Sequence, residues 1–290
     1  MTQSCKPDPL SLYPAGLYLI ATPIGNLGDI TARAIETLKH LDTLYCEDTR
    51  VTGGLLQHLG VSCRMIPYDD HHAAMREAEI LQGLAAGQRI GLCSDAGMPL
   101  ISDPGYKLVR AVTEAGYAVT SLPGANAVLT ALQLSALPTD RFMFQGFLPA
   151  KATARREIIA QLAALPMTLV FYETAPRLAD SMSDMLAGFG DRPAAVAREL
   201  TKKFEQTRRG TLSQLLDSIN DTPPRGEIVV VVAGAPDTQM VATPAALNDL
   251  LAALLPHYPT RQVADIAAAA TGLPRRDVYN ACLKYRDQAE

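Results

Sequence analysis

The chain has 290 residues, 19% of them charged, and a formal net charge of −4. Its length suits about two globular domains. It holds no apolar run near the roughly 18 residues of a membrane span, and the first ten residues have neither the basic start nor the apolar core of a secretory signal. Its five cysteines are scattered and never spaced C-x-x-C, so we expect no disulfide framework, no zinc site and a cytoplasmic location.

The first half of the chain alternates short apolar runs with segments of helical spacing. The predicted strands are residues 16–21, 43–46, 61–67, 89–93 and 117–122. Such alternation predicts a parallel, doubly wound α/β sheet. In such sheets, ligands bind in the crevice at the carboxyl ends of the strands, so the loops after these strands are the first candidates for a site.

The fourth of these strands is followed by the loop with the strongest signal of a site, in the stretch RIGLCSDAGMPLISDPG (residues 89–105). After Cys93 come small and polar residues that let a ligand approach the backbone, and Asp95 can accept hydrogen bonds from it. Asp103 followed by Pro104 predicts the N-cap and first turn of a helix. An ordinary loop between a strand and a helix remains the alternative.

The loops after the first two strands also carry candidate residues. TPIGNLGD (22–29) follows the first strand as a glycine-containing turn that leads into a helix, an arrangement that suits an anion. Gly25 and Gly28 are, however, only two of the three glycines of the dinucleotide fingerprint. After the second strand, Glu47, Asp48 and Arg50 are three ionisable groups within four residues, which suggests a site. The alternative is a surface loop in which Asp48 and Arg50 pair with each other.

A metal site is not expected. His71 and His72, with Glu77, are the residues that most resemble a ligand set, but adjacent histidines point to different faces of a helix.

The second half predicts another α/β domain and then a helical tail. Its expected strands are residues 141–147, 168–172, 194–198, 204–212 and 227–233, and the sheet should be mixed because no helix separates the third strand from the fourth. Helices over 244–255, 260–271 and 274–286 could form a helix-turn-helix or a structural cap. We therefore expect a flexible leader (1–14), two α/β domains (15–138 and 139–240) and a helical extension (241–290).

Seven blocks of sequence together resemble one family. They are TPIGNLGDIT (22–31), CEDTR (46–50), SDAGMPLISDPG (94–105), LPGANA (122–127), FYETAPR (171–177), RELTKKFE (198–205) and GEIVVVVAG (226–234). In this order they are similar to the RsmI family of ribosomal RNA 2′-O-methyltransferases, which has the tetrapyrrole-methylase fold. Met98 and His72 depart from it, since the family usually has threonine and asparagine there.

The resemblance implies a reaction and its partners. The methyl donor would be S-adenosylmethionine and the acceptor the ribose 2′-hydroxyl of a decoding-centre cytidine in 16S ribosomal RNA of the small subunit. The protein would be a homodimer, with no DNA partner. The residues implied for the donor are Pro23, Gly25, Asp95, Ala96, Gly97, Met98, Pro99, Ser102, Ala125, Tyr172, Ala197 and Gly226.

The residues themselves agree with this chemistry. A sulfonium donor needs mainly alignment and the removal of one proton. Glu47, Asp48 and Arg50 are the candidates for substrate-side chemistry, with the base unassigned. The candidate RNA contacts are basic: Lys151, Arg155, Arg156, Arg198, Lys202, Lys203, Arg275 and Arg276. The alternatives are a methylase of a small tetrapyrrole, a nicotinamide-dependent oxidoreductase and a non-enzymatic RNA-binding protein.

Overall fold

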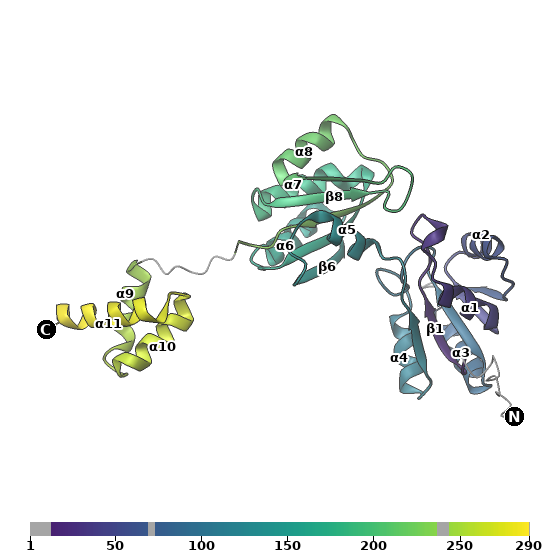
Figure 1. The fold of residues 1–290 in the computed structure, drawn as a ribbon, viewed down its shortest axis with the longest axis horizontal. Helices are drawn as coiled ribbons and strands as arrows, with labels where there is room; N and C mark the ends of the chain where they lie inside the picture. The colour runs from purple at the N-terminus through teal and green to yellow at the C-terminus, as the bar shows by residue number, and fades with distance from the viewer. Residues whose placement is uncertain (1–12, 69–72, 237–243, 290) are drawn as a thin grey trace, which may run out of the picture. The chain divides into compact units, whose positions relative to one another are not determined.

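The computed structural model describes residues 13–68, 73–236 and 244–289, and these fall into two compact units (Figure 1). The first unit comprises residues 1–163 and 167–234, and the second comprises 164–166 and 235–290. The first unit contains two α/β lobes, each built on one five-stranded sheet. His71 and His72 lie outside the described residues.

The sheet of the first lobe has the order β3-β2-β4-β1-β5, and every pairing in it is parallel. Its strands are β1 (Gly16–Ile20), β2 (Thr43–Cys46), β3 (Met65–Pro67), β4 (Arg89–Cys93) and β5 (Val119–Leu122). The chain reverses its direction across the sheet between β1 and β4, so the loops that follow these strands flank one crevice.

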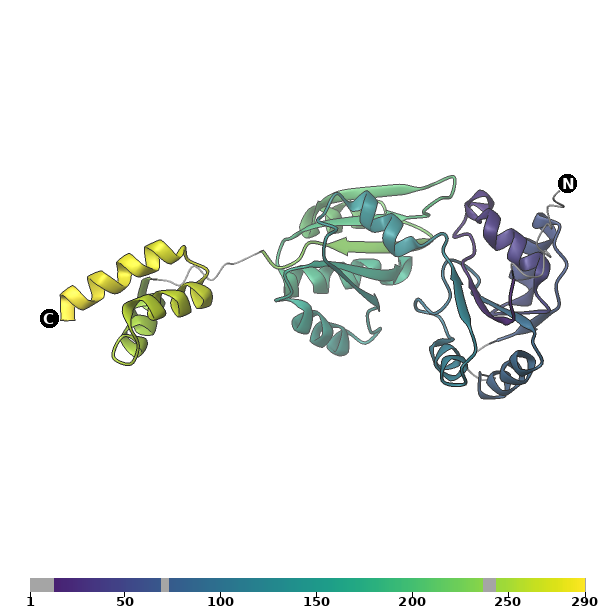
Figure 2. The same cartoon turned by 60° about the horizontal axis from the view of Figure 1, so that its bottom comes forward.

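Helices cover both faces of this sheet (Figure 2), which confirms the doubly wound prediction. The helices are α1 (Ala32–His40), α2 (Thr49–Leu59), α3 (Ala73–Ala85) and α4 (Tyr106–Glu114). Leu38 of α1 and Leu56 of α2 pack in a core cluster on one face, while Ile80 of α3 and Leu108 of α4 pack in a cluster on the other. Apolar burial on both faces explains why the strands are continuous apolar runs.

Two local predictions for this lobe were wrong. Asp103 does not cap a helix: α4 begins at Tyr106 with Gly105 as its N-cap, because Gly105 at φ 129° takes a conformation open to glycine. The third strand begins at Met65 and not at residue 61. Helix α2, over which no specific prediction was made, begins at Thr49 with the Asp48 side chain as its cap.

The second lobe has the mixed sheet that the sequence predicts, in the order β6-β7-β10-β8-β9. Its strands are β6 (Phe142–Phe147), β7 (Thr168–Thr174), β8 (Pro193–Arg198), β9 (Gln206–Thr211) and β10 (Glu227–Val232). Only β6 and β7 pair in parallel, and β8 and β9 form a hairpin. Its helices are α5 (Ala127–Ser135), α6 (Ala152–Leu162), α7 (Leu178–Phe189) and α8 (Leu212–Asp221).

The second unit is a small helical body with its own core. Its helices are α9 (Pro244–Leu254), α10 (Thr260–Thr271) and α11 (Arg275–Ala289), close to the predicted ranges. Leu251, Val263 and Val278, one from each helix, are fully buried in one cluster. Within the described parts of the chain, no helix combines the length and apolarity needed to cross a membrane.

Candidate functional site

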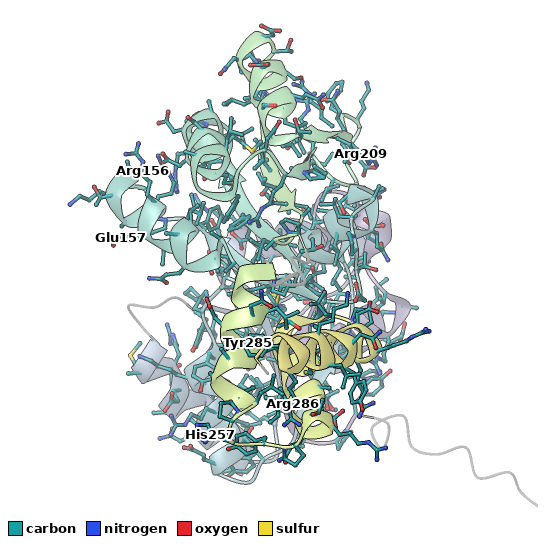
Figure 3. The ribbon with its side chains drawn as sticks, turned by 90° about the vertical axis from the view of Figure 1, so that its left-hand side faces the viewer. Arg156, Glu157, Arg209, His257, Tyr285 and Arg286 are labelled. Atoms are coloured by element: carbon teal, nitrogen blue, oxygen red, sulfur yellow. The ribbon has the colours of Figure 1, made fainter. Side chains whose placement is uncertain are left out.

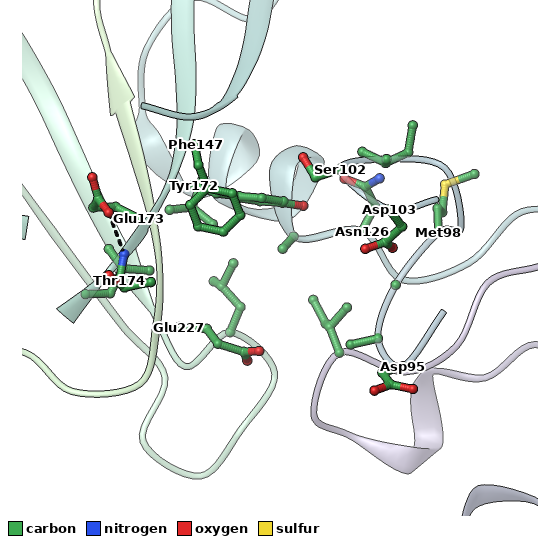
Figure 4. Close-up of a pocket in the computed structure, with 18 of the residues that line it drawn as sticks. Asp95, Met98, Ser102, Asp103, Asn126, Phe147, Tyr172, Glu173, Thr174 and Glu227 are labelled. Atoms are coloured by element: carbon green, nitrogen blue, oxygen red, sulfur yellow. Dashed lines mark hydrogen bonds between the residues drawn. The ribbon is translucent and has the colours of Figure 1, made fainter. Parts of the chain in front are cut away.

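The first unit holds a cavity of about 320 Å³, a size typical of small-molecule sites (Figure 4). Residues of both lobes line it, some from loops and some from strands. The lining residues are Ile24, Glu47, Asp95, Ala96, Gly97, Met98, Ile101, Ser102, Asp103, Asn126, Ala127, Phe147, Tyr172, Glu173, Thr174, Leu200, Gly226, Glu227, Ile228 and Val229. Those of the first lobe follow β1, β2, β4 and β5, so the cavity lies at the carboxyl ends of the parallel strands.

The loop after β4, here called the 94–105 loop, is held to its neighbours by backbone bonds. Gly97 and Thr22 exchange two backbone hydrogen bonds of 2.8 and 3.1 Å, which ties this loop to the one after β1. The Asp95 carboxylate accepts a 3.0 Å bond from the Asp48 amide, which ties it to the loop after β2. Asp95 and Gly97 together therefore hold three loops around the cavity.

This loop also contains strained backbone. Leu100 (φ 72°) and Ser102 (φ 67°) are both left-handed, although neither is a glycine. Such conformations cost about 1–3 kcal/mol each and cluster at binding sites. Ser102 lines the cavity, so the strain lies where the loop faces it.

The described lining residues include five carboxylic acids and no lysine, arginine or histidine. Burial raises the pKa of Glu47, and the charges of Asp95 and Asp103 raise it further. Burial also raises the pKa of Asp103, against a hydrogen bond with Ser94 that lowers it. Burial, with the charges of Asp103 and Glu227, raises the pKa of Tyr172 to about 12. The cavity is thus an acidic environment that favours a cationic ligand.

Glu173 lies in the wall of the cavity with its carboxylate fully engaged. It is 3% exposed, and it accepts a hydrogen bond from the Ser181 hydroxyl at 2.5 Å. It also accepts one from the Thr174 amide at 2.9 Å (Figure 4). Arg177 Nε lies 3.4 Å from the same carboxylate, while Arg177 Nη2 donates to the Leu148 carbonyl. This network fixes the end of β7, which carries the cavity residue Tyr172.

The loop between β8 and β9, here called the 199–205 loop, forms another part of the wall. Leu200 lines the cavity and is 6% exposed, between left-handed Glu199 (φ 49°) and Thr201 (φ 66°). Lys202 Nζ donates to the carboxylate of Glu227 at 2.7 Å and to that of Glu199 at 3.3 Å. These acidic partners raise the pKa of Lys202, outweighing the opposite effect of its burial.

Two glycines allow close approach to this loop. A Cβ added to Gly25 would lie 2.4 Å from Cγ of Lys202, so glycine there lets the lysine stem cross the loop after β1. A Cβ added to Gly226 would lie 1.9 Å from Oε1 of Glu199, and Gly226 also has φ 87°. Both positions therefore exclude larger residues.

Of the twelve residues predicted to hold the donor, seven line the cavity: Asp95, Ala96, Gly97, Met98, Ser102, Tyr172 and Gly226. The other five, Pro23, Gly25, Pro99, Ala125 and Ala197, do not. Ala197 is buried in the core of the second lobe, and Pro99 is buried beside a much smaller hollow. Gly25 instead contacts Lys202.

The structure separates the three candidates for substrate-side chemistry. Glu47 lines the cavity and is exposed. Asp48 and Arg50 form a 2.5 Å ion pair, as in the surface-loop alternative, and the Arg50 side chain is 90% exposed. Hydrogen bonds from Arg50 lower the pKa of Asp48 to about 2, which makes Asp48 a weak base. Neither Asp48 nor Arg50 lines the cavity.

One of the basic residues expected to contact RNA is inside the protein. Arg155 is 5% exposed, and its guanidinium is 2.6 Å from the Asp184 carboxylate. Arg155 cannot contribute an exposed cation, and its expected role as an RNA contact is corrected to that of a core ion pair. Arg156 bonds the same carboxylate at 2.7 Å from the outside, and its side chain is 69% exposed (Figure 3). A run of basic residues in the sequence does not show which of them face the interior of the protein.

The remaining basic candidates for RNA contact differ in whether neighbouring side chains already bind them. Lys151, Lys203 and Arg276 are exposed. Arg198 bonds the Gln206 side chain at 3.1 Å, and Lys202 is engaged by its two glutamates. Arg275 pairs with Asp265 in the second unit. In that unit, Figure 3 shows Tyr285 and Arg286 on α11.

Sequence reasoning missed several polar or aromatic residues of the cavity: Asp103, Asn126, Phe147, Glu173, Thr174 and Glu227. Five of them, all but Phe147, lie within the blocks that carry the resemblance, and Asp103 among them was taken for a helix cap. Position directly after a strand was the usable signal for Asn126, which follows β5 closely and caps α5. Phe147 and Glu173, inside strands, gave no such signal.

Among the described residues, no group of histidine, cysteine, aspartate and glutamate has an arrangement that could hold a metal ion. The charges of Asp95 and Asp103 repel that of Glu47, which is one reason why the pKa of Glu47 is raised. A cationic group of a ligand would relieve that repulsion.

The comparisons with known proteins first define a class. The model of the tetrapyrrole (corrin/porphyrin) methylases matches residues 16–216, and that of the RsmI C-terminal HTH domain matches residues 241–286. Among solved structures, the methyltransferase CobJ is 17% identical with a TM-score of 0.57, covering 76% of this chain and 95% of that one. Uroporphyrin-III C-methyl transferase from Thermus thermophilus, complexed with S-adenyl homocysteine, is 18% identical with a TM-score of 0.52, covering 75% and 97%. At these identities the likeness shows the fold alone.

Curated relatives narrow the class. A protein of Mesorhizobium japonicum named ribosomal RNA small subunit methyltransferase I is 45% identical, over 95% of this chain and 94% of the relative. Proteins of the same name in Escherichia coli O157:H7 and Erythrobacter litoralis are 43% and 47% identical, over 92% and 96% of this chain and 94% and 97% of theirs. The chain belongs to the tetrapyrrole methylase family and, within it, to the family of ribosomal RNA small subunit methyltransferase I.

Proposed function

We propose that this chain transfers the methyl group of S-adenosylmethionine to the ribose 2′-hydroxyl of a decoding-centre cytidine in 16S ribosomal RNA. The observation that carries the proposal is the full-length similarity, at 43–47% identity, to proteins named ribosomal RNA small subunit methyltransferase I. The acidic cavity supports the choice of donor independently.

The charge of the cavity favours a sulfonium compound. S-Adenosylmethionine carries a positive sulfonium and an ammonium group, which the carboxylates of Glu47, Asp95 and Asp103 would stabilise. A nicotinamide dinucleotide instead brings a diphosphate, which the carboxylates of Glu47, Asp95 and Asp103 would repel. The lining therefore disfavours the oxidoreductase alternative.

Two carboxylates of the cavity suit different parts of the reaction. Glu47 is exposed, so a bulky acceptor can reach it, and its raised pKa makes it a better proton acceptor than an ordinary glutamate. We assign Glu47 as the general base for the 2′-hydroxyl. Asp103 is half-buried, which suits the ammonium group of the donor. Transfer itself requires the attacking oxygen, methyl carbon and sulfur to be in line.

The lining also favours ribose as the acceptor over a base. A flipped base is usually stacked between aromatic or apolar side chains. The aromatic lining residues, Phe147 and Tyr172, lie with ring centroids only 5.5 Å apart and tilted by 58°, which leaves no slot for a base between them.

A methylase of a small tetrapyrrole shares this fold, as the solved structures show. The helical unit over residues 244–289, with exposed Arg276, Lys284 and Arg286, has no evident use with such a substrate. With a ribosomal RNA substrate, the helical unit would have a role, because its exposed cations could bind phosphates. We further propose action in the cytoplasm, where bacterial ribosomes lie, and as a homodimer.

The test combines donor binding with identification of the product. Calorimetric titration should show binding of S-adenosylmethionine and none of NAD. Labelled methyl groups should then be transferred to naked 16S RNA or to assembled small subunits lacking the modification. The modified nucleotide should resist alkaline cleavage, since a methylated 2′-oxygen no longer attacks the neighbouring phosphate. A methyl group found on the base would refute the acceptor while leaving the donor intact.

A further inference from the structure

The 199–205 loop exposes an aromatic ring beside a lysine. Phe204 is 65% exposed, among the most exposed of the large apolar side chains described. Lys203 Nζ lies 5.6 Å from the centroid of its ring. Both residues belong to the RELTKKFE block, and neither lines the cavity.

The loop that carries this pair is firmly held. The Thr201 amide donates to the Glu205 carboxylate at 2.6 Å, and the Lys202 amide donates to the Glu199 carbonyl at 3.1 Å. Leu200 anchors the loop in the core of the second lobe. The exposure of Phe204 is therefore not the result of a frayed loop. The loop is ordered by these bonds, and it holds the Phe204 ring in solvent.

The residues just before this pair in the chain reach the cavity. Leu200 lines the cavity, and the ammonium group of Lys202 reaches Glu227, which lines it too. Lys203 and Phe204 follow directly in the chain and face solvent. A polymer whose reactive group entered the cavity would have its neighbouring units outside, close to this loop.

We propose that Phe204 stacks against an unpaired base of the RNA substrate, next to the nucleotide that is methylated, with Lys203 near its phosphate. This rests on the proposed function. Unpaired RNA is held by base stacking on aromatic rings combined with cations, and any base offers a π-face. A protein partner fits less well, because the residues after Phe204 are the exposed and polar Glu205 and Gln206 and not an apolar patch.

The absence of tryptophan from the chain provides a direct probe. In Phe204→Trp the indole is the sole tryptophan, and a stacked base should quench its fluorescence. The titrants are an unstructured single-stranded RNA spanning the target cytidine, and small ribosomal subunits lacking the modification. The matched control is Phe142→Trp at an exposed position of β6, 39% exposed in the wild type, which should not respond. Equal responses of the two variants would overturn the proposal.

Substitutions separate stacking from other contacts. Phe204→Ala should weaken binding of the same RNA by roughly 5- to 100-fold, the range of one lost stacking contact. Phe204→Tyr should keep the affinity. Phe204→Leu, which is apolar but not aromatic, should lose it. Titration with S-adenosylmethionine should be unchanged in all three, which shows that they remain folded.

Two results would reject the stacking role and point elsewhere. If Phe204→Leu binds RNA like the wild type, the contact is merely apolar. If Phe204→Ala changes the sedimentation of the protein but not its RNA affinity, the ring packs on a second copy of the chain. The proposed function is judged separately: wild-type protein that fails to methylate small subunits refutes it, whereas efficient wild-type transfer with an unaffected Phe204→Ala refutes only the stacking.

Discussion

The 94–105 loop and the 199–205 loop share a backbone device but differ in charge. Each contains two left-handed residues that are not glycine, Leu100 and Ser102 in the first and Glu199 and Thr201 in the second. The first loop presents acids to the cavity, whereas the second presents a lysine and a phenyl ring to solvent. Left-handed residues therefore occur in two loops that present different groups, carboxylates in one and a lysine and a phenyl ring in the other.

The difference matches the two substrates of the proposed reaction. A sulfonium donor is cationic and is best met by fixed carboxylates, whereas RNA is polyanionic and is best met by exposed cations and rings. The negative net charge of the whole chain, −4, does not exclude RNA binding, because exposed cations such as Lys203 are available locally. Four substitutions should test this difference between the two loops.

The largest effect should come from the acidic side of the cavity. Glu47→Gln should lower turnover by roughly 10²- to 10⁴-fold, the usual contribution of a general base. S-Adenosylmethionine affinity should change little. Because the pKa of Glu47 is raised and only its ionised form accepts a proton, wild-type turnover should fall as the pH drops through that raised pKa.

The control for this prediction is Asp103→Asn, which removes a neighbouring acid and should weaken donor binding more than it slows transfer. If Asp103→Asn abolishes the pH dependence of turnover and Glu47→Gln keeps it, the base is Asp103. Single-turnover kinetics at saturating donor distinguish the two cases.

The second prediction tests which of the two arginines, Arg155 or Arg156, stabilises the core and which is a surface residue. Arg155→Met leaves Asp184 buried with only one partner, so the free energy of unfolding should fall by about 3–5 kcal/mol. Arg156→Met removes the exposed partner and should cost only about 0–1 kcal/mol. Urea denaturation measures both. Equal costs would mean that the inward and outward arginines are interchangeable, against their different burial.

The third prediction concerns space in the 94–105 loop. Ala96→Leu should weaken S-adenosylmethionine binding by roughly 10- to 200-fold, because Ala96 lines the cavity and a surplus methylene in a pocket costs about 1–3 kcal/mol. RNA affinity should stay as in the wild type if the two loops are independent. Calorimetry with each ligand measures this, and unchanged donor affinity would move the donor site away from Ala96.

The smallest effect should come from one exposed cation. Lys203→Gln should weaken RNA binding only modestly, but the slope of log affinity against log salt should flatten by roughly 0.7–0.9. Lys107→Gln, an exposed lysine on α4, is the matched control and should leave the slope unchanged. A slope that is the same in all three proteins would show that Lys203 meets no phosphate.

The sequence predicted the order and type of most elements because their apolar runs are uninterrupted and their helices amphipathic. It failed where one residue decides between conformations. Asp103-Pro104 has the pattern of a helix start, but Gly105 delays α4 and leaves Asp103 for the cavity. Arg155 and Arg156 are adjacent and identical, and only packing against α7 assigns one of them to the interior.

The two sheets also differ in how far along the chain their partners lie. Strands β8 and β9 are joined by one short loop and can pair as soon as that hairpin is made. In the first lobe, Gly16 of β1 pairs with Arg89 of β4, and β1 also pairs with β5, which ends at Leu122. Closing such long loops costs conformational entropy before the strand contacts that stabilise the lobe can form. During synthesis β1 must therefore wait, unpaired, until most of the first lobe has left the ribosome, the particle on which the finished protein is proposed to act.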